Sequence, residues 1–291
     1  MQRLAIERRP NDDVLVGFLP AYYQELPEFD VDDRRDDDLY AVALAHIGVG
    51  RRRAPGETLV RVLSPDRDRD GWHSDRSVVL IVTDDAPFLV DTIRIVLEQH
   101  GAATHLLVHP MLRVRRGPDD EMTAVLTASD DQYGAMVEAW TQVEIDRCDG
   151  ARAERLRNDV MHAVEAVHRV VADFGTMRDR MMALSEVDPL LEWLASGNFV
   201  FLGAATYDMT NDGPVLRPDS TLGQIGVDSL IDPEIVVDGP VVAVARSSAP
   251  ASIHRDSRMT AVTVLRHDQP GGTFAERFVG LLASTAYRQS V

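Results

Sequence analysis

The sequence predicts an α+β protein in which a small α+β sandwich is followed by a small antiparallel-sheet domain. Two observations support this fold class. The stretch 77–116 has the pattern of a strand, an acidic turn, a helix and a second strand, which is how a layered α+β unit begins. After residue 187 the chain shows short strand-like runs separated by turns with Gly and Asp, and little helix, which favours an antiparallel sheet.

The first unit is the clearest element pattern in the chain. Its strand is the apolar, β-branched run Ser77–Thr83, which is typical of a buried strand. The run stops at 84–87, where an acidic residue can cap a helix and Pro87 suits the first helical turn. Apolar residues then recur at helical spacing as far as Gly101, which fits the residue just past a helix end. Residues 103–115 return to an extended pattern.

The remaining elements follow the same rules of periodicity. Helices are expected at 11–26, 38–53, 150–184 and 190–195, and strands at 58–63, 121–127, 140–146, 199–207, 241–246, 260–266 and 274–282. We therefore divide the chain into a lead-in at 1–71, a first domain at 72–186 that ends in a long helix, and a second domain at 187–291.

Composition excludes several classes of protein. The net charge of −17 and the pI near 4.8 argue against nucleic acid or an anionic membrane as a partner. The N-terminus has no apolar signal region, and no apolar run is long enough to span a bilayer. The single cysteine, Cys148, favours a reducing compartment, so a cytoplasmic location is expected. Its position at a helix start can lower a thiol pKa, but without a second cysteine no redox role is expected.

The chain contains no lysine, so all 30 of its Lys and Arg residues are arginine. Arginine stays protonated in proteins and cannot serve as a proton-transfer group or a Schiff-base nucleophile. This excludes P-loop, pyridoxal and lysine-dependent amino-acid dehydrogenase chemistry within these residues. Codon usage rich in arginine is the simplest cause of the bias. The exclusion of lysine-dependent chemistry holds whatever the cause.

Four short segments carry a resemblance to a known family. They stand in order along the chain at Asp84–Asp91, Leu191–Gly203, Ser252–Arg255 and Arg277–Tyr287. Each resembles a marker of the N-terminal region of the large bacterial NAD-specific glutamate dehydrogenases. Any one segment is a weak signal, but four in register are fairly specific.

The resemblance implies more than the pattern does. It implies an ACT-like domain of ferredoxin-like βαββαβ order at 72–186 and a PAS-like domain at 187–291. The NAD-binding catalytic domain of that family lies far downstream, so this chain would be a non-catalytic regulatory and assembly segment. Its partners would be that catalytic domain and other copies in a homo-oligomer. NAD would belong to the parent enzyme, and no cofactor is expected in this chain.

The candidate ligand site is the turn after the first strand, where ACT domains usually bind an amino acid. It comprises Asp84, Asp85, Ala86, Pro87, Phe88 and Leu89. The usual pattern has a glycine that lets the backbone approach the ligand, but Phe88 takes its place and its ring would fill the cavity. Helix capping and packing are the alternative explanation of this turn. His254 and Arg255 are a second candidate, either as an effector or interface contact or as a surface turn.

Other motifs carry less weight. His162, Glu165 and His168 lie three residues apart on a predicted helix, but zinc helices place two histidines four apart, so no metal site is expected. Gly48–Gly50 lacks the third glycine of a dinucleotide fingerprint and follows a helix. Arg51–Arg53 favours a helix C-terminus, with an intersubunit or acidic-ligand contact left open.

Two functions remain. One is the regulatory and assembly segment just described. The other is a free-standing amino-acid sensor with ACT-like and PAS-like modules. The turn at Phe88 distinguishes them, because a blocked turn favours assembly and an open turn favours sensing. We find no nucleophile elbow and no metal-ligand spacing, so the chain itself is not expected to be an enzyme.

Overall fold

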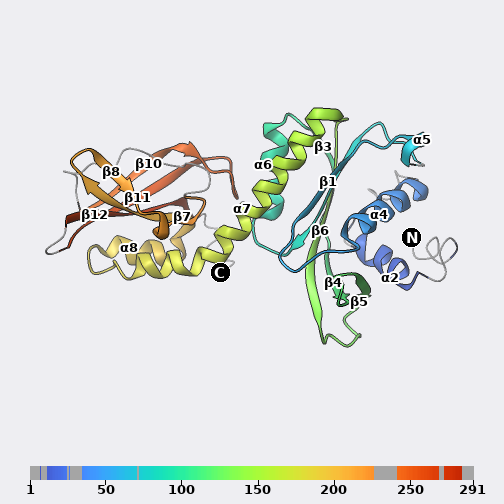
Figure 1. Cartoon of the computed structure of the whole chain (residues 1–291), viewed down its shortest axis with the longest axis horizontal. Helices are drawn as coiled ribbons and strands as arrows, with labels where there is room; N and C mark the ends of the chain where they lie inside the picture. The colour runs from blue at the N-terminus through green and yellow to red at the C-terminus, as the bar shows by residue number, and fades with distance from the viewer. Residues whose placement is uncertain are drawn as a thin grey trace. The chain divides into compact units, whose positions relative to one another are not determined.

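The computed structural model describes residues 12–24, 35–70, 72–225, 241–268 and 272–283, together with Glu7 and Leu26. They fall into two compact units, residues 1–164 and 165–291 (Figure 1). The division lies within the long helix α7 (Gly150–Met182), whereas the change in sequence pattern predicts a domain boundary at 187. Residues 284–287 of the last family-like segment lie outside the described residues.

The first unit contains the expected helices and strands in sequence order, with two differences: the short helix at 67–70 was not expected, and the extended run at 103–115 forms two strands. The elements are α2 (Asp13–Tyr22), α4 (Asp36–Gly50), β1 (Leu59–Leu63), α5 (Arg67–Asp70), β2 (Ser77–Asp84), α6 (Leu89–Gln99), β3 (Thr104–Val108), β4 (Met111–Arg116), β5 (Met122–Leu126), β6 (Ala135–Ile145) and the first half of α7. The lead-in at 1–71 is therefore part of this unit, because β1 pairs with β2 and α2 and α4 contribute to its core.

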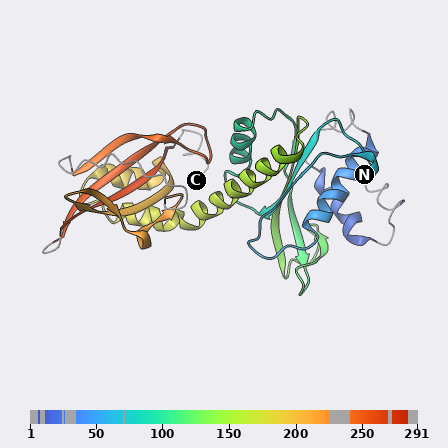
Figure 2. The same cartoon turned by 45° about the horizontal axis from the view of Figure 1, so that its top comes forward.

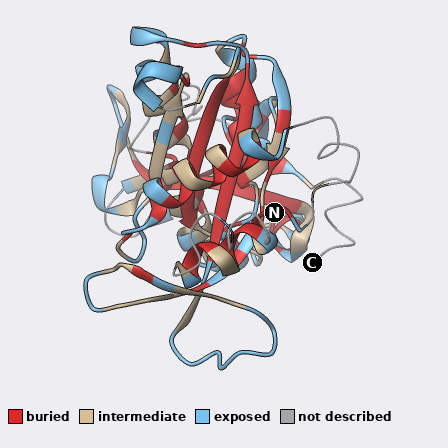
Figure 3. Cartoon of the chain, turned by 90° about the vertical axis from the view of Figure 1, so that its right-hand side faces the viewer, coloured by how far each residue is buried: buried red, intermediate tan, exposed pale blue. Residues whose placement is uncertain are grey.

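The sheet of the first unit has the strand order β1-β2-β6-β4-β5, with β3 also paired to β6, and every pairing is antiparallel. Strand β2 is buried from Ser77 to Thr83, because helices cover both faces of the sheet. Helices α2 and α4 lie on one face, and α6 and α7 on the other (Figures 1 and 2). The central strands are correspondingly the buried ones in Figure 3.

The order of elements differs from the expected βαββαβ. Along the sequence, strand β5 follows β4 and precedes β6, at the place where that order would put the second helix. Helix α7 comes only after β6. No described strand returns from α7 to the first sheet. The run 121–127 has too few apolar residues at helical spacing and instead forms a hairpin with β4, with Val114 opposite Val125. The α+β class is confirmed, and the strict βαββαβ order is wrong.

The second unit is built on a second antiparallel sheet. Its elements after α7 are α8 (Pro189–Trp193), a π-helical turn (Leu194–Asn198), β7 (Phe199–Thr210), β8 (Gly213–Leu216), a 3-10 turn (Pro218–Ser220), β9 (Leu222–Gly223), β10 (Val242–Pro250), β11 (Arg258–Asp268) and β12 (Gly272–Leu282). The strand order is β10-β11-β12-β7-β8, with β9 also paired to β7.

Aromatic side chains fill the core between this sheet and its helices. Phe201 contacts Phe199 and Phe278 with ring centroids 5.1 and 6.1 Å apart, and Met177 of α7 packs in the same cluster. Gly280 allows the close approach of β7 and β12, because a Cβ there would lie 2.1 Å from the Val200 carbonyl oxygen. The antiparallel-sheet expectation for the C-terminal part is thus met.

None of the described helices is both long enough and apolar enough to cross a bilayer.

Candidate functional site

The turn proposed as a ligand site connects the end of β2 to the start of α6. Asp85 and Pro87 are exposed, Ala86 is buried and Phe88 is half-buried. Leu89 is the first residue of α6 and is buried on the sheet. The structure therefore brings these residues together on one short connection, as the sequence predicts.

The start of α6 differs from the expectation. The capping residue is Phe88, in the left-handed region with φ 71°, and no side chain caps the helix. The prediction that an aspartate caps the helix and that Pro87 lies in its first turn is wrong. At the other end, Gly101 has φ 59° and donates from its N–H to the carbonyl of Glu98. That end matches the expected glycine stop.

Asp84 is the last residue of β2, four residues before the N-cap Phe88, and its carboxylate is bound by a buried arginine. Arg53 Nη2 donates to Asp84 Oδ1 at 2.5 Å, and Arg53 Nη1 donates to Glu138 Oε1 at 2.9 Å. The side chains of Arg53 and Glu138 are 0% exposed, while that of Asp84 is 42% exposed. Asp84 is thus the edge of a charged cluster that continues under the turn.

Two further residues, with three donor groups between them, complete the binding of Glu138. Arg116 donates from Nε to Oε1 at 2.7 Å and from Nη2 to Oε2 at 2.9 Å, and Trp140 Nε1 donates to Oε2 at 3.1 Å. Each carboxylate oxygen of Glu138 therefore accepts two hydrogen bonds, which uses its four acceptor positions. We call Arg53, Asp84, Arg116, Glu138 and Trp140 the Glu138 cluster.

The Glu138 cluster also holds the end of α4. Arg116 Nη2 donates to the carbonyl of Gly50 at 3.0 Å, the last residue of that helix. A Cβ at Gly50 would lie 2.3 Å from the Trp140 ring. Gly50 is therefore needed for close packing against Trp140, whereas a Cβ at Gly48 would meet no atom within 4 Å beyond its neighbours in the helix.

The arginine run divides between two roles. Arg51 and Arg52 pair with Glu121 at the surface, whereas Arg53 is buried in the cluster. The run lies at the C-terminal end of α4, as expected, with Arg51 as the C-cap, but the side chain that donates to the carbonyl of Gly50 is that of Arg116. Nothing in the spacing of Arg53, Asp84 and Glu138 along the chain signals their contact. Three consecutive arginines do not show which one is buried.

The chemistry of the cluster is that of an anchor. Its two cations are arginines, which do not release protons near neutral pH, and the Glu138 carboxylate has no acceptor position left. At the turn itself, Asp84 is paired with Arg53 and Phe88 is half-buried.

A second buried polar network lies on the α2 and α4 side of the sheet, and sequence reasoning missed it. The Tyr22 hydroxyl lies 2.6 Å from His46 Nδ1 and 3.0 Å from Gln142 Oε1. His46 Nε2 lies 3.2 Å from the carbonyl oxygen of Ile81, which can only accept, so Nε2 carries the proton and Nδ1 accepts. Burial lowers the pKa of His46 to about 3, while the bond to Ile81 opposes this shift. Burial also raises the pKa of Tyr22 well above its usual value.

The other candidate residues are placed as follows. His254, with φ 71°, and Arg255 lie on the connection between β10 and β11 in the second unit. Arg255 Nη2 donates to the carbonyl of Leu282 at 2.8 Å, which ties this turn to the end of β12. Among the described residues no group of three His, Cys, Asp or Glu side chains is placed to hold a metal ion.

Cys148 departs from the expectation for its pKa. The residue is buried, and burial raises the pKa of its thiol. Its backbone N–H donates to the Ser77 hydroxyl at 2.8 Å. The thiol therefore packs as a small apolar group, and the lowered pKa suggested by the helix start is wrong.

Comparison with known proteins identifies relatives of this chain. Residues 18–160 match the family model described as "Glutamate dehydrogenase, ACT1 domain". The chain is 28% identical to an NAD-specific glutamate dehydrogenase of Halomonas elongata and 27% identical to one of Pseudomonas aeruginosa; each match covers 94% of this chain and 19% of the relative. A Mycobacterium tuberculosis protein of the same name is 25% identical over 85% of this chain and 16% of its own length.

The chain thus spans about a fifth of the length of the curated relatives it matches. The matched family segment includes the turn at 84–89 and all residues of the Glu138 cluster. Residues 18–160 are therefore similar to the ACT1 domain of glutamate dehydrogenases, and the chain as a whole is similar to the N-terminal fifth or less of proteins named NAD-specific glutamate dehydrogenase.

Proposed function

We propose that this chain is the non-catalytic N-terminal regulatory and assembly segment of a large NAD-dependent glutamate dehydrogenase. The parent enzyme would oxidise L-glutamate with NAD⁺ and water to 2-oxoglutarate, ammonium and NADH. The observation that carries this proposal is the unequal coverage of the matches, which take in 94% of this chain but 19% of each of two relatives. A match of that kind fits a segment that accompanies a catalytic domain.

The residues of the chain support the non-catalytic role. It has no lysine, the residue type on which the family's catalytic domain depends. The Glu138 cluster, to which Asp84 of the turn belongs, contains two arginines and a fully bonded carboxylate, which are suited to holding structure. In this proposal NAD and the substrate bind elsewhere in the parent, and the partners of this chain are the downstream catalytic domain and further copies in a homo-oligomer.

The modules are assigned on the same basis. We propose an ACT-like domain at 72–186, preceded by the lead-in at 1–71, and a PAS-like domain at 187–291. The antiparallel sheet with helices on one face supports the second assignment. A cytoplasmic location is proposed because the single cysteine is buried and unpaired.

The two candidate contacts have different roles in this proposal. The turn at 84–89 is the ligand position of related domains, but Phe88 and the Asp84–Arg53 pair close it, which favours assembly over sensing there. His254 and Arg255 are proposed as an effector or subunit contact of the second unit. The alternative, a free-standing amino-acid sensor, is favoured by an open groove elsewhere in the first unit, described below.

The test compares the activity of the isolated chain with that of the full-length parent and of a parent that lacks this segment. The purified chain is incubated with L-glutamate and NAD⁺ and NADH formation is followed by absorbance, beside the full-length parent and a parent lacking this segment. We expect no turnover by the chain alone. We expect turnover by the full-length parent and, in the truncated parent, an altered response to effectors or an altered oligomeric state by light scattering.

Two results would contradict the proposal. NADH formation by the isolated chain would make it an enzyme in its own right. A truncated parent with unchanged kinetics, unchanged effector response and unchanged mass would show that the segment neither regulates nor assembles the enzyme.

A further inference from the structure

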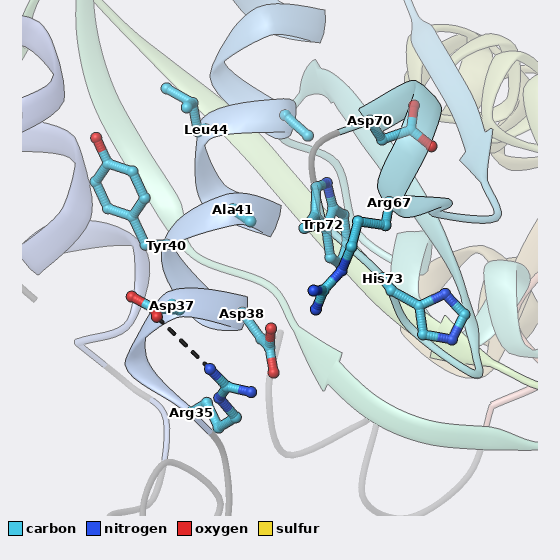
Figure 4. Close-up of a pocket in the computed structure, with 11 residues that line it drawn as sticks. Arg35, Asp37, Asp38, Tyr40, Ala41, Leu44, Arg67, Asp70, Trp72 and His73 are labelled. Carbon is cyan, nitrogen blue, oxygen red and sulfur yellow. Dashed lines mark ion pairs between the residues drawn. The ribbon is translucent and has the colours of Figure 1, made fainter.

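A groove with a volume of about 640 Å³ opens between α4 and the segment that carries α5 (Figure 4). One wall is the N-terminal half of α4, where Ala41 and Leu44 provide apolar surface. The opposite wall carries the Arg67 side chain and the half-buried ring of Trp72. The groove belongs to the first unit and shares no residue with the turn at 84–89.

Several of the charged residues that line the groove are already paired. Arg35 pairs with Asp37 at 3.7 Å, and Asp70 accepts from Arg69 at 2.8 Å. His73 lies against a neighbouring aspartate at 3.1 Å. These pairs leave little net charge available to a ligand.

Two side chains of opposite charge remain. Among the described residues, neither the Asp38 carboxylate nor the Arg67 guanidinium has a hydrogen bond or an ion pair. Asp38 lies in the first turn of α4, and Arg67 begins α5 on the facing wall. Figure 4 shows both side chains directed to the same groove, with the Trp72 ring beside Arg67. Asp38 and Arg67 are the free charges of a site with an aromatic wall.

We propose that this groove binds a free amino acid with an apolar side chain. Its carboxylate would bind Arg67, its ammonium group would bind Asp38, and its side chain would lie on Trp72 and Leu44. A simple anion would meet the aspartates of the groove, and a simple cation would meet its arginines. A zwitterion satisfies both free charges, since each makes a charge-assisted hydrogen bond to the opposite end of the ligand. Its meaning as an effector site rests on the proposed function, whereas binding itself does not.

The three tryptophans of the chain supply a selective measurement. Trp72 lines the groove, Trp140 is buried and its indole N–H donates to Glu138, and Trp193 lies in the second unit. In a ¹⁵N-labelled chain titrated with L-leucine, we expect a saturable shift of the Trp72 indole resonance, while those of Trp140 and Trp193 stay in place.

Variants and ligand analogues assign the two contacts. R67A and D38N should each weaken leucine binding by about tenfold or more. The matched variants R94A and D119N change exposed residues outside the groove and should bind as the unchanged chain does. Leucinamide lacks the carboxylate, so its weaker binding should be insensitive to R67A. N-acetyl-leucine lacks the ammonium group, so its binding should be insensitive to D38N.

The proposal fails if the Trp72 resonance does not move at millimolar leucine, or if both analogues bind as well as leucine does. It also fails if R94A weakens binding as much as R67A. These outcomes concern the isolated chain and are independent of NADH formation by the parent. If the isolated chain binds leucine but removal of the segment leaves the kinetics, effector response and mass of the parent unchanged, the binding inference stands and the proposed function is overturned.

Discussion

In the first unit, the turn at 84–89 and the groove beside Trp72 differ in how their charged side chains are used. At the turn, Asp84 is bound to the buried Arg53, and a half-buried Phe88 stands where the ACT pattern usually has a glycine. In the groove, Asp38 and Arg67 face the same open volume without bonds to described residues. Charges at the turn hold the fold together, while those of the groove remain available to solvent or a ligand.

The comparison teaches that a ligand position expected from family resemblance can be replaced by internal contacts. A buried ion pair is stabilising only if each charge keeps its partner and its hydrogen bonds. Glu138 meets that condition with four donors. Asp38 and Arg67 of the groove form no ion pair with described residues, so substitutions at these two positions should have little effect on the stability of the fold. The predictions below test this contrast, starting with the largest effect.

Loss of the Glu138 carboxylate should have the largest effect on stability. The variant E138A leaves the buried guanidinium groups of Arg53 and Arg116 without their shared counter-ion, which should cost about 3–5 kcal/mol. Hydrogen exchange of the β2 and β6 amides measures the loss within the first unit. E154A breaks an exposed pair with Arg157 and should leave this exchange unchanged. Equal protection in E138A and the unchanged chain would contradict an anchoring role.

Acid should weaken the same unit through His46, which lies on α4, the helix that forms one wall of the groove. The pKa of His46 is about 3 in the folded state and about 6.5 in the unfolded state. Between these values the unfolded state binds the extra proton, so stability falls as pH falls below about 6.5, with a limiting slope of about 1.4 kcal/mol per pH unit. Above pH 6.5 this residue adds no pH dependence.

The pH dependence of β2 exchange, corrected for the intrinsic exchange rate, checks this expectation. H46Q should be less stable at pH 7 but should show a shallower decline between pH 6.5 and 4. H162Q changes an exposed histidine and should leave the slope unchanged. A slope as steep in H46Q as in the unchanged chain would show that His46 is not the group responsible.

Removal of the Phe88 ring should have a smaller effect on stability and a qualitative effect on binding. In F88G the left-handed conformation no longer costs about 1 kcal/mol, and the lost contacts of a half-buried ring offset this gain. We expect the turn amides at 84–89 to respond to added amino acid in F88G and not in the unchanged chain. If they remain silent in F88G, the Asp84–Arg53 pair closes the turn without help from the ring.

The smallest effect is expected at the groove. Arg67 is exposed and has no ion pair or hydrogen bond to the described part of the chain, so R67A should leave the thermal midpoint unchanged within error while it weakens leucine binding. This separation of stability from binding is the opposite of that expected for E138A. A large drop in the midpoint of R67A would show that the groove is part of the structural core.

Local patterns were sufficient to predict most elements of the fold. The apolar run at Ser77–Thr83 and the glycine at 101 predicted β2 and the end of α6, because burial and left-handed backbone geometry are local requirements. The start of α6 was not predictable in the same way. An aspartate shortly before a proline suits a helix cap, but the helix begins only at Leu89, after Phe88 in the left-handed conformation. Asp84 pairs with the distant Arg53.

The sequence by itself determined the type and order of most helices and strands, the lack of lysine among these residues and the resemblance to a family, since each depends on residue types and short-range spacing. The tertiary structure alone decided that Arg53 lies under the turn with Glu138, that His46 is buried and neutral, and that Asp38 faces Arg67 across a groove. These contacts join residues from separate helices and strands. Their energies depend on burial and on the geometry of partners far apart in the chain, which no local pattern records.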